Sequence, residues 1–264
     1  MRLQILLSTM HQKDFSLLDK MKVHTDAVVV NQCDSESIEE FVYGEHKIKW
    51  INSKERGLSR SRNYAIRNAN DDICLLSDDD LEYVVEYEEI ILNAFKQYPD
   101  ADIIAFQVEG IEEKFKDYYP NTRYLNYLTI MKVSSVEIAF RLSSIKETVE
   151  FDEQFGAGSR YSMGEENIFL FNCLKQGMKV LYVPIKIADL HIGESTWFNG
   201  YNKRYFNSKG AAFTCMSRLF SIPFIIQFAI RKYKLYHSEA TRLQAIRYML
   251  EGRKEFLSSQ AARG

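Results

Sequence analysis

Short apolar runs alternate with segments of helical spacing through the first hundred residues. The apolar runs lie at residues 3–7, 27–30, 48–51, 73–76 and 103–106. Between them, residues 58–69 and 84–98 carry apolar side chains three and four positions apart, which is the spacing of one helix face. This alternation predicts an α/β fold with a mainly parallel central sheet flanked by helices.

The pattern changes after residue 110. Residues 110–150 are irregular and rich in aromatic side chains, which either stack on sugar rings or pack within a covering loop. We interpret most of them as packing residues. A further helical pattern at 164–176 ends at Gly177, and a strand predicted at 179–183 is stopped by Pro184.

The last quarter of the chain is basic. Residues 201–264 hold 12 Lys and Arg against 3 Asp and Glu, whereas residues 1–200 hold 22 against 33. An apolar block at 212–230 and an amphipathic helix predicted at 243–257 make up much of this helical extension. It either lies peripherally on an anionic membrane or docks on the body with its charges in water, and we weigh the two equally.

Composition indicates a cytoplasmic globular protein. Apolar residues make up 46% of the 264 positions, and the four cysteines have no paired spacing, as in reduced proteins. The N-terminus has the features of a first strand and not of a signal peptide. No stretch approaches the roughly 20 apolar residues of a membrane-spanning helix.

Three adjacent aspartates, Asp78, Asp79 and Asp80, follow the apolar run 73–76. Ligands of α/β folds bind where strands leave the sheet. The mutual repulsion of three carboxylates is relieved by water, basic side chains or a divalent metal that carries a nucleotide diphosphate. The alternative is an acidic, solvated turn.

Residues 55–68, ERGLSRSRNYAIRN, begin a helix that follows Gly57. Arg62 falls on its inward face and near its N-terminus, where phosphate oxygens bind well. Arg62 holds a diphosphate, pairs with an aspartate of the triplet, or does both.

Residues 155–170 combine glycines with a pair of acids. Gly156 and Gly158 leave a backbone that a ligand can approach, and Glu165 and Glu166 open a helix. Such glutamates are most often dipole partners, but one of them here is a candidate general base. His191, after a further strand, is a candidate metal ligand, although an isolated histidine is more often a packing or surface residue.

Taken in this order, the first strand ending in Ser8 and Thr9, the ERGLSRSRN segment, the aspartates, the GEEN helix and the late histidine resemble an inverting family-2 glycosyltransferase of the GT-A fold, of the kind that builds bacterial cell-surface glycans. The resemblance covers about residues 3–198. It implies a catalytic domain at 1–198, with a nucleotide-sugar half at about 1–109 and an acceptor half at about 110–198. Residues 199–264 are the extension.

The resemblance also implies roles for individual residues. The implied catalytic base is Glu166, with Glu165 beside it, and the implied metal ligands for Mn²⁺ or Mg²⁺ are Asp80, Asp78 and His191. The implied nucleotide-sugar site comprises Ser8, Thr9, Asn31, Arg56, Gly57, Arg62, Asp78, Asp79, Gly156 and Gly158. The sequence departs from the family at Asn31, where aspartate is usual, and at Glu166, where aspartate is more typical.

The expected activity is metal-dependent transfer of a hexose from a nucleotide sugar, with a UDP-sugar as the expected donor. The acceptor is a hydroxyl of a saccharide or of a lipid-linked glycan on the inner face of the plasma membrane. No nucleic acid is an expected partner. The alternatives are a sugar nucleotidyltransferase and a catalytically silent nucleotide- or glycan-binding protein.

Overall fold

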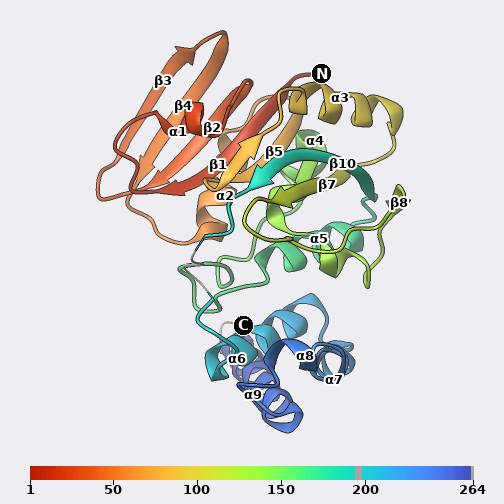
Figure 1. The fold of residues 1–264 in the computed structure, drawn as a ribbon. Coiled ribbons are helices and arrows are strands. Elements are labelled where there is room, and N and C mark those ends of the chain that lie inside the picture. Colours follow the sequence, from red (N-terminus) through yellow and green to blue (C-terminus); the bar gives the residue numbers. More distant parts are fainter. Residues whose placement is uncertain (194–197, 263–264) are drawn as a thin grey trace.

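A single sheet runs through the N-terminal body of the protein (Figure 1). The computed structural model describes residues 1–193 and 198–262. Within them the strand order is β3-β4-β2-β1-β5-β9-β7-β10-β6, and β8 pairs with β10. The strands are β1 (Leu3–Met10), β2 (Asp26–Gln32), β3 (Ser37–Tyr43), β4 (His46–Ser53), β5 (Ile73–Asp78), β6 (Leu81–Tyr83), β7 (Ile103–Gly110), β8 (Arg123–Tyr124), β9 (Ile138–Arg141) and β10 (Val180–Leu190).

The core of the sheet is parallel, as predicted. Strands β4, β2, β1 and β5 pair in parallel, and so do β7 and β10. All six predicted strands are present, as β1, β2, β4, β5, β7 and β10. The prediction that Pro184 ends the last of them is wrong, because β10 continues through Pro184 to Leu190. Its register with β7 is irregular between Tyr182 and Lys186, and such an irregularity accommodates a proline within a strand.

Four strands were not predicted. Strand β3 forms an antiparallel hairpin with β4, and β9 joins β5 to β7 by antiparallel pairing on both sides. Strands β6 and β8 both pair with β10. Strand β3 is largely exposed and lacks a strict apolar alternation, and the other three span only two to four residues, too few for a recognisable period.

Helices cover both faces of the sheet. On one face lie α2 (Leu58–Asn68) and α5 (Glu165–Lys175), and on the other α1 (Leu17–Lys20) and α3 (Tyr87–Gln97). Helix α4 (Leu142–Ile145) and the 3₁₀ turns η1 (Ile130–Lys132) and η2 (Ser135–Glu137) lie in the segment predicted to be irregular. Successive side chains of β1 enter opposite core clusters, Leu6 on the α2 face and Leu7 on the α3 face, as the pleat of a strand requires.

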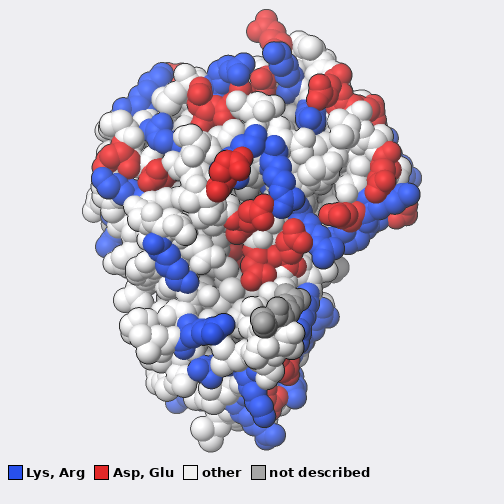
Figure 2. All heavy atoms as spheres, turned by 180° about the vertical axis from the view of Figure 1, so that it is seen from behind, with Lys and Arg blue, Asp and Glu red and all other residues white. Residues whose placement is uncertain are grey.

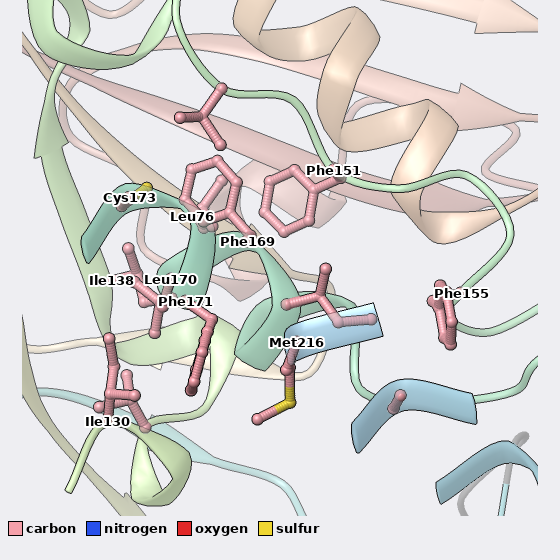
Figure 3. Close-up of a cluster of buried hydrophobic side chains, with 14 of the residues drawn as sticks. Leu76, Ile130, Ile138, Phe151, Phe155, Phe169, Leu170, Phe171, Cys173 and Met216 are labelled. Atoms are coloured by element: carbon pink, nitrogen blue, oxygen red, sulfur yellow. The ribbon is translucent and has the colours of Figure 1, made fainter. Parts of the chain in front are cut away.

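The core on the α2 face combines aliphatic side chains with several stacked aromatic rings. The rings of Phe151 and Phe169 stack in parallel with their centroids 4.2 Å apart, and Phe171 extends from the same helix toward Met216 of the C-terminal region (Figure 3). Met216 and Phe155 are buried in this same cluster. The C-terminal helices therefore share a hydrophobic core with the body.

The C-terminal region contains α6 (Lys203–Met216), α7 (Ser221–Arg231), α8 (Tyr233–Tyr236) and α9 (Arg242–Ala261). Helices α6 and α9 cross in close contact. A Cβ atom added to Gly210 would lie 1.9 Å from the Met249 carbonyl oxygen, and one added to Gly252 would lie 2.0 Å from that of Asn207. Phe256 of α9 reaches the body, with its ring centroid 5.7 Å from that of Phe155. In the part of the chain that is described, no helix combines the length and the apolar character needed to cross a bilayer.

Candidate active site at the ends of the parallel strands

The ends of β1 and β5 meet beside the start of α2. Ser8 of β1 lies opposite Asp78 of β5 in the sheet, and Ser61 of α2 makes a 2.8 Å hydroxyl hydrogen bond to Ser8. The hydroxyl of Thr9 donates a hydrogen bond to the Asp79 carboxylate. Two sequence-predicted site segments, the end of the first strand and the aspartate triplet, are thus in direct contact.

Arg62 connects three elements through one buried guanidinium. Its side chain is 1% exposed and donates to both oxygens of Asp78, at 2.9 and 3.1 Å, and to Glu165 at 3.0 Å. It also donates to the Ser135 hydroxyl at 2.8 Å. Burial opposes its charge, but the carboxylates of Asp78 and Glu165 outweigh burial and raise the pKa of Arg62. The pairing with an aspartate of the triplet, one of the two readings of Arg62, is present in the structure.

The two acids that open α5 have different surroundings. Glu165 is buried and held by Arg62, whereas Glu166 is half-buried. Burial, together with the charge of Glu165, raises the pKa of Glu166 to about 7. A carboxyl with this pKa exchanges its proton near neutral pH.

Gly164 sets the direction in which α5 begins. It caps the helix with a φ of 91°, in the left-handed region that favours glycine. A Cβ atom at this position would lie 2.9 Å from the Cβ of Ala212 in α6. The start of α5, and with it the acid pair, is packed directly on the C-terminal region.

His191 lies beside the aspartate triplet. Strand β6 begins immediately after Asp80 and pairs with the end of β10, so the His191 amide donates to the Asp80 carbonyl at 2.9 Å. Nδ1 of His191 lies 3.2 Å from a carboxylate oxygen of Glu112. The tertiary fold brings the late histidine and the triplet together, although 110 positions separate them in the chain.

Asp80 is the aspartate of the triplet whose carboxyl has no side-chain partner among the described residues. Asp78 is held by Arg62 and Asp79 by Thr9. Desolvation by the surrounding site and the charges of Asp78 and Asp79 raise the pKa of Asp80 to about 7. A carboxylate crowded by two others is stabilised by a nearby cation.

The side chains of Asp80 and His191 offer oxygen and nitrogen donor atoms. Such donors suit a divalent metal that takes the rest of its coordination shell from a bound ligand and water. Within residues 1–193 and 198–262, no group of three or more His, Cys, Asp or Glu side chains is arranged to hold a metal ion. Mg²⁺ typically binds one or two protein carboxylates together with substrate phosphates and water. A carboxyl and an imidazole are suitable ligand types for that shell, but the His191 imidazole lies beside Glu112 and Glu82, at 3.2 and 3.9 Å. Metal binding by Asp80 and His191 stays a prediction.

Two predicted donor-site residues are held by the protein itself. The amide of Asn31 exchanges two 3.0 Å hydrogen bonds with the backbone of Gln12 and donates to Asn52 at 2.8 Å. The guanidinium of Arg56 donates to the carbonyls of Cys33, Ser53 and Lys54 and pairs with Asp34. Both side chains shape the loops that follow β1, β2 and β4, and contact of either with a nucleotide stays a prediction.

The predicted glycines pack against other parts of the site. The N–H of Gly57 donates to the Gln32 side chain at 2.8 Å. A Cβ atom on Gly156 would lie 3.2 Å from Cδ of Glu165, and one on Gly158 would lie 3.4 Å from Cα of Gly57. These close approaches join the loop at 155–158 to α2 and α5, and an approach by a ligand stays a prediction.

Two lysines near Glu166 were not among the predicted site residues. Lys209 of α6 and Lys116 both exert electrostatic attraction on Glu166, and burial lowers the pKa of each lysine. Lys116 also forms an ion pair with the buried Glu137. The basic character of the C-terminal region was visible in the sequence, but no spacing distinguished Lys209 from its neighbours.

Solved structures share this fold. Residues 1–349 of TarS from S. aureus superpose with a TM-score of 0.62 at 11% identity, covering 90% of this chain and 74% of that one. The same fragment in complex with UDP-GlcNAc gives 0.62 at 13% identity, and in complex with UDP 0.63 at 12% identity, with the same coverage. At these identities the likeness establishes the fold, which is GT-A. A comparison with curated proteins found no match.

The sequence itself matches a family profile. The profile is that of glycosyl transferase family 2, and it aligns with residues 16–163, from just before α1 to the residue before the Gly164 cap. The match spans more than half of the 264 residues and includes α2, Arg62 and the aspartate triplet. The protein is therefore a member of glycosyl transferase family 2.

Proposed function

We propose that this glycosyltransferase moves a sugar from a UDP-sugar to a hydroxyl of a saccharide or lipid-linked glycan acceptor, with inversion at the anomeric carbon and with Glu166 as the base. Residues 1–198 would form the catalytic domain, with donor contacts mainly in 1–109 and acceptor contacts mainly in 110–198. Residues 199–264 would form the extension.

The different surroundings of Glu165 and Glu166 support this proposal. A general base works best when its pKa lies near the operating pH, and burial beside Glu165 raises the pKa of Glu166 to about 7. Glu165 is occupied by Arg62, which leaves Glu166 to accept a proton. As the acceptor oxygen bonds to the anomeric carbon, its proton passes to Glu166. The bond from that carbon to the diphosphate breaks, and its electron pair leaves with UDP.

The aspartate edge of the sheet would bind the leaving group. TarS structures with UDP and UDP-GlcNAc on the same fold support a UDP-sugar as the donor. Asp80 and His191 would hold Mn²⁺ or Mg²⁺, which would supply positive charge to the diphosphate. Arg62 would hold the carboxylates of Asp78, at the end of β5, and Glu165, at the start of α5, through its ion pairs with both. Ser8 and Thr9 would set the end of β1 beside the nucleotide.

Glu166→Gln tests the proposal because glutamine keeps the shape of the side chain and cannot accept the proton. We expect UDP release from UDP-sugars, with acceptor present, to fall roughly 10²–10⁴-fold, the usual contribution of general acid–base catalysis. The assay is run with Mn²⁺, with Mg²⁺ and after chelation, and chelation is expected to abolish release that either metal restores.

Glu88→Gln is the matched control. Glu88 is also half-buried and is also the second residue of its helix, α3, but it lies on the other face of the sheet. The activity of the Glu88→Gln variant should equal that of the unmodified protein. Full activity in Glu166→Gln would refute the assignment of the base. Formation of pyrophosphate from a sugar 1-phosphate and a nucleoside triphosphate would instead favour a nucleotidyltransferase.

A further inference from the structure

Helix α7 has an apolar outer face. Ile222, Ile226 and Ile230 follow one another at intervals of four residues, so they lie along one side of the helix, and they are 44%, 44% and 58% exposed. Leu219 and Phe220 precede the helix and are 79% and 54% exposed. Contiguous exposed apolar surface of this kind marks an interaction site more often than isolated exposed residues do.

The inner face of α7 accounts for the packing of the helix. Phe224, Ile225 and Ala229 are buried in the same cluster as the core of the body. The exposed isoleucines therefore make a second apolar face that packing within the chain does not require.

Helix α9 shows the opposite arrangement. The sequence made α9 the amphipathic candidate, but its apolar side chains Ala245, Met249 and Phe256 are buried against α6 and the body. Of the two alternatives for the extension, α9 therefore follows the one in which a helix docks on the body. Leu243 and Leu250 of α9 stay 80% and 39% exposed, but seven positions separate them, whereas the exposed isoleucines of α7 recur at every fourth position. The larger exposed apolar face is therefore that of α7.

The chain segment that contains α7 carries charges of one sign. From residue 218 to residue 235 the chain holds Arg218, Arg231, Lys232 and Lys234, all exposed, and no Asp or Glu. Arg242 adds a further cation, with its guanidinium carbon 4.2 Å from the centroid of the Tyr233 ring. In Figure 2 the lower part of the molecule, where Figure 1 places α6–α9, shows Lys and Arg, with a few acidic residues on the right, among mostly uncharged surface.

We propose that residues 218–235 bind the surface of an anionic phospholipid membrane, with Ile222, Ile226 and Ile230 entering the interface. Helices that lie in a membrane interface combine an apolar face with flanking Lys and Arg, which attract anionic headgroups. The rigid attachment of α7 to the body presents this face without any unfolding. The proposal does not depend on the identity of the donor or acceptor.

The test is sedimentation of the full-length protein with vesicles of phosphatidylglycerol and phosphatidylcholine, compared with vesicles of phosphatidylcholine alone. We expect binding to the anionic vesicles that weakens as salt increases. The triple variant Ile222→Ser, Ile226→Ser, Ile230→Ser should lose at least about tenfold in partitioning, because each isoleucine forfeits burial in the interface. The matched control, Ile38→Ser with Val42→Ser, removes apolar residues that are 56% and 68% exposed on the edge strand β3, and it should bind as the unmodified protein does.

A charge-reversal pair tests the electrostatic part. Arg231→Glu with Lys234→Glu should weaken binding by at least about tenfold, since each basic residue near an anionic surface contributes substantially to attraction. Lys13→Glu with Lys96→Glu, exposed residues of the body, should have little effect.

Three outcomes would overturn the proposal. The first is an unmodified protein that fails to bind anionic vesicles, and the second is a triple serine variant that binds them as well as the unmodified protein. The third is light scattering showing a dimer that the serine variant dissolves, with no vesicle binding, because the face would then be an interface between two copies. UDP release by the same variants in vesicle-free solution reports separately on the proposed catalytic function and should be unchanged.

Discussion

The strand-end site and helix α7 depart in opposite ways from the usual rule that charged side chains are exposed and large apolar side chains are buried. At the site, charged groups are buried: Arg62 is 1% exposed between Asp78 and Glu165. On α7, isoleucines face water. Charged residues are seldom fully buried unless they are paired, and large exposed apolar patches usually have a partner.

The two regions differ in where their partners lie. The buried guanidinium finds its partners within the chain, so the structure accounts for most of its contacts. The outer face of α7 has no partner in the described part of the chain. The first region is therefore tested by removing an internal partner, and the second by comparing the two faces of one helix.

The largest effect is expected from Arg62→Met. Removing one member of a buried ion pair leaves carboxylates uncompensated and typically costs about 3–5 kcal/mol. Urea unfolding of the variant should show a loss of this size in the free energy of unfolding. If the variant does not accumulate as folded protein, Arg62→Lys, which keeps the charge and loses the forked geometry, should show a smaller loss.

Arg67→Met, on the same helix, is the control for the Arg62 experiment. Arg67 pairs with Glu150 at 2.7 Å, but both side chains are more than half exposed, and exposed pairs contribute about 0–1 kcal/mol. An equal loss in the free energy of unfolding for Arg62→Met and Arg67→Met would mean that the buried ion pairs stabilise the protein no more than the exposed one.

A smaller effect, and a sharper test of α7, comes from two adjacent residues. Ile225 is fully buried and Ile226 is 44% exposed. Ile225→Ala should cost about 2–5 kcal/mol by leaving a cavity. Ile226→Ala should change the free energy of unfolding by no more than about 0.5 kcal/mol. Urea unfolding of both variants measures the difference. A large loss at Ile226 would show that the outer face stabilises the fold and would weaken the case for a membrane role.

The smallest effect concerns pH. Burial beside Glu165 raises the pKa of Glu166 to about 7, and a general base acts in its ionised form. At saturating metal, kcat/KM should therefore fall about tenfold per pH unit below about 7 and level off above it. A rate profile between pH 5 and pH 9 measures this. A plateau that extends down to pH 5 would contradict the assignment of Glu166.

Much of the fold could be predicted from periodicity. Five of the six predicted strands and the helices α2, α3 and α5 are present within a few residues of their expected bounds, because each buries an apolar face. The sixth, β10, begins as expected but extends beyond Pro184 to Leu190. Strand β9 was missed because three buried residues in an irregular segment carry no period. The apolar block at 212–230 divides into α6 and α7 around residues 217–220, a break that its continuous apolar pattern concealed.

The sequence placed Asp78–Asp80, Arg62, Glu165, Glu166 and His191 in one site. The structure brings the segments that carry them together, and the roles of these residues stay predictions. Which aspartate and which acid of α5 pair with Arg62 depends on distances across separate elements. Lys209 approaches Glu166 because α6 packs beside Gly164, a contact that no local pattern records.

The sequence by itself determined the six long strands and the helices α2, α3 and α5, since apolar periodicity acts locally along the chain. It also determined that the last quarter is basic. Tertiary structure alone decided that Arg62 pairs with Glu165 and not with Glu166, that α9 packs one apolar side on α6 and the body, and that α7 keeps an apolar face in water. These outcomes depend on which surfaces meet, and the free energy of such contacts belongs to pairs of residues far apart in the chain.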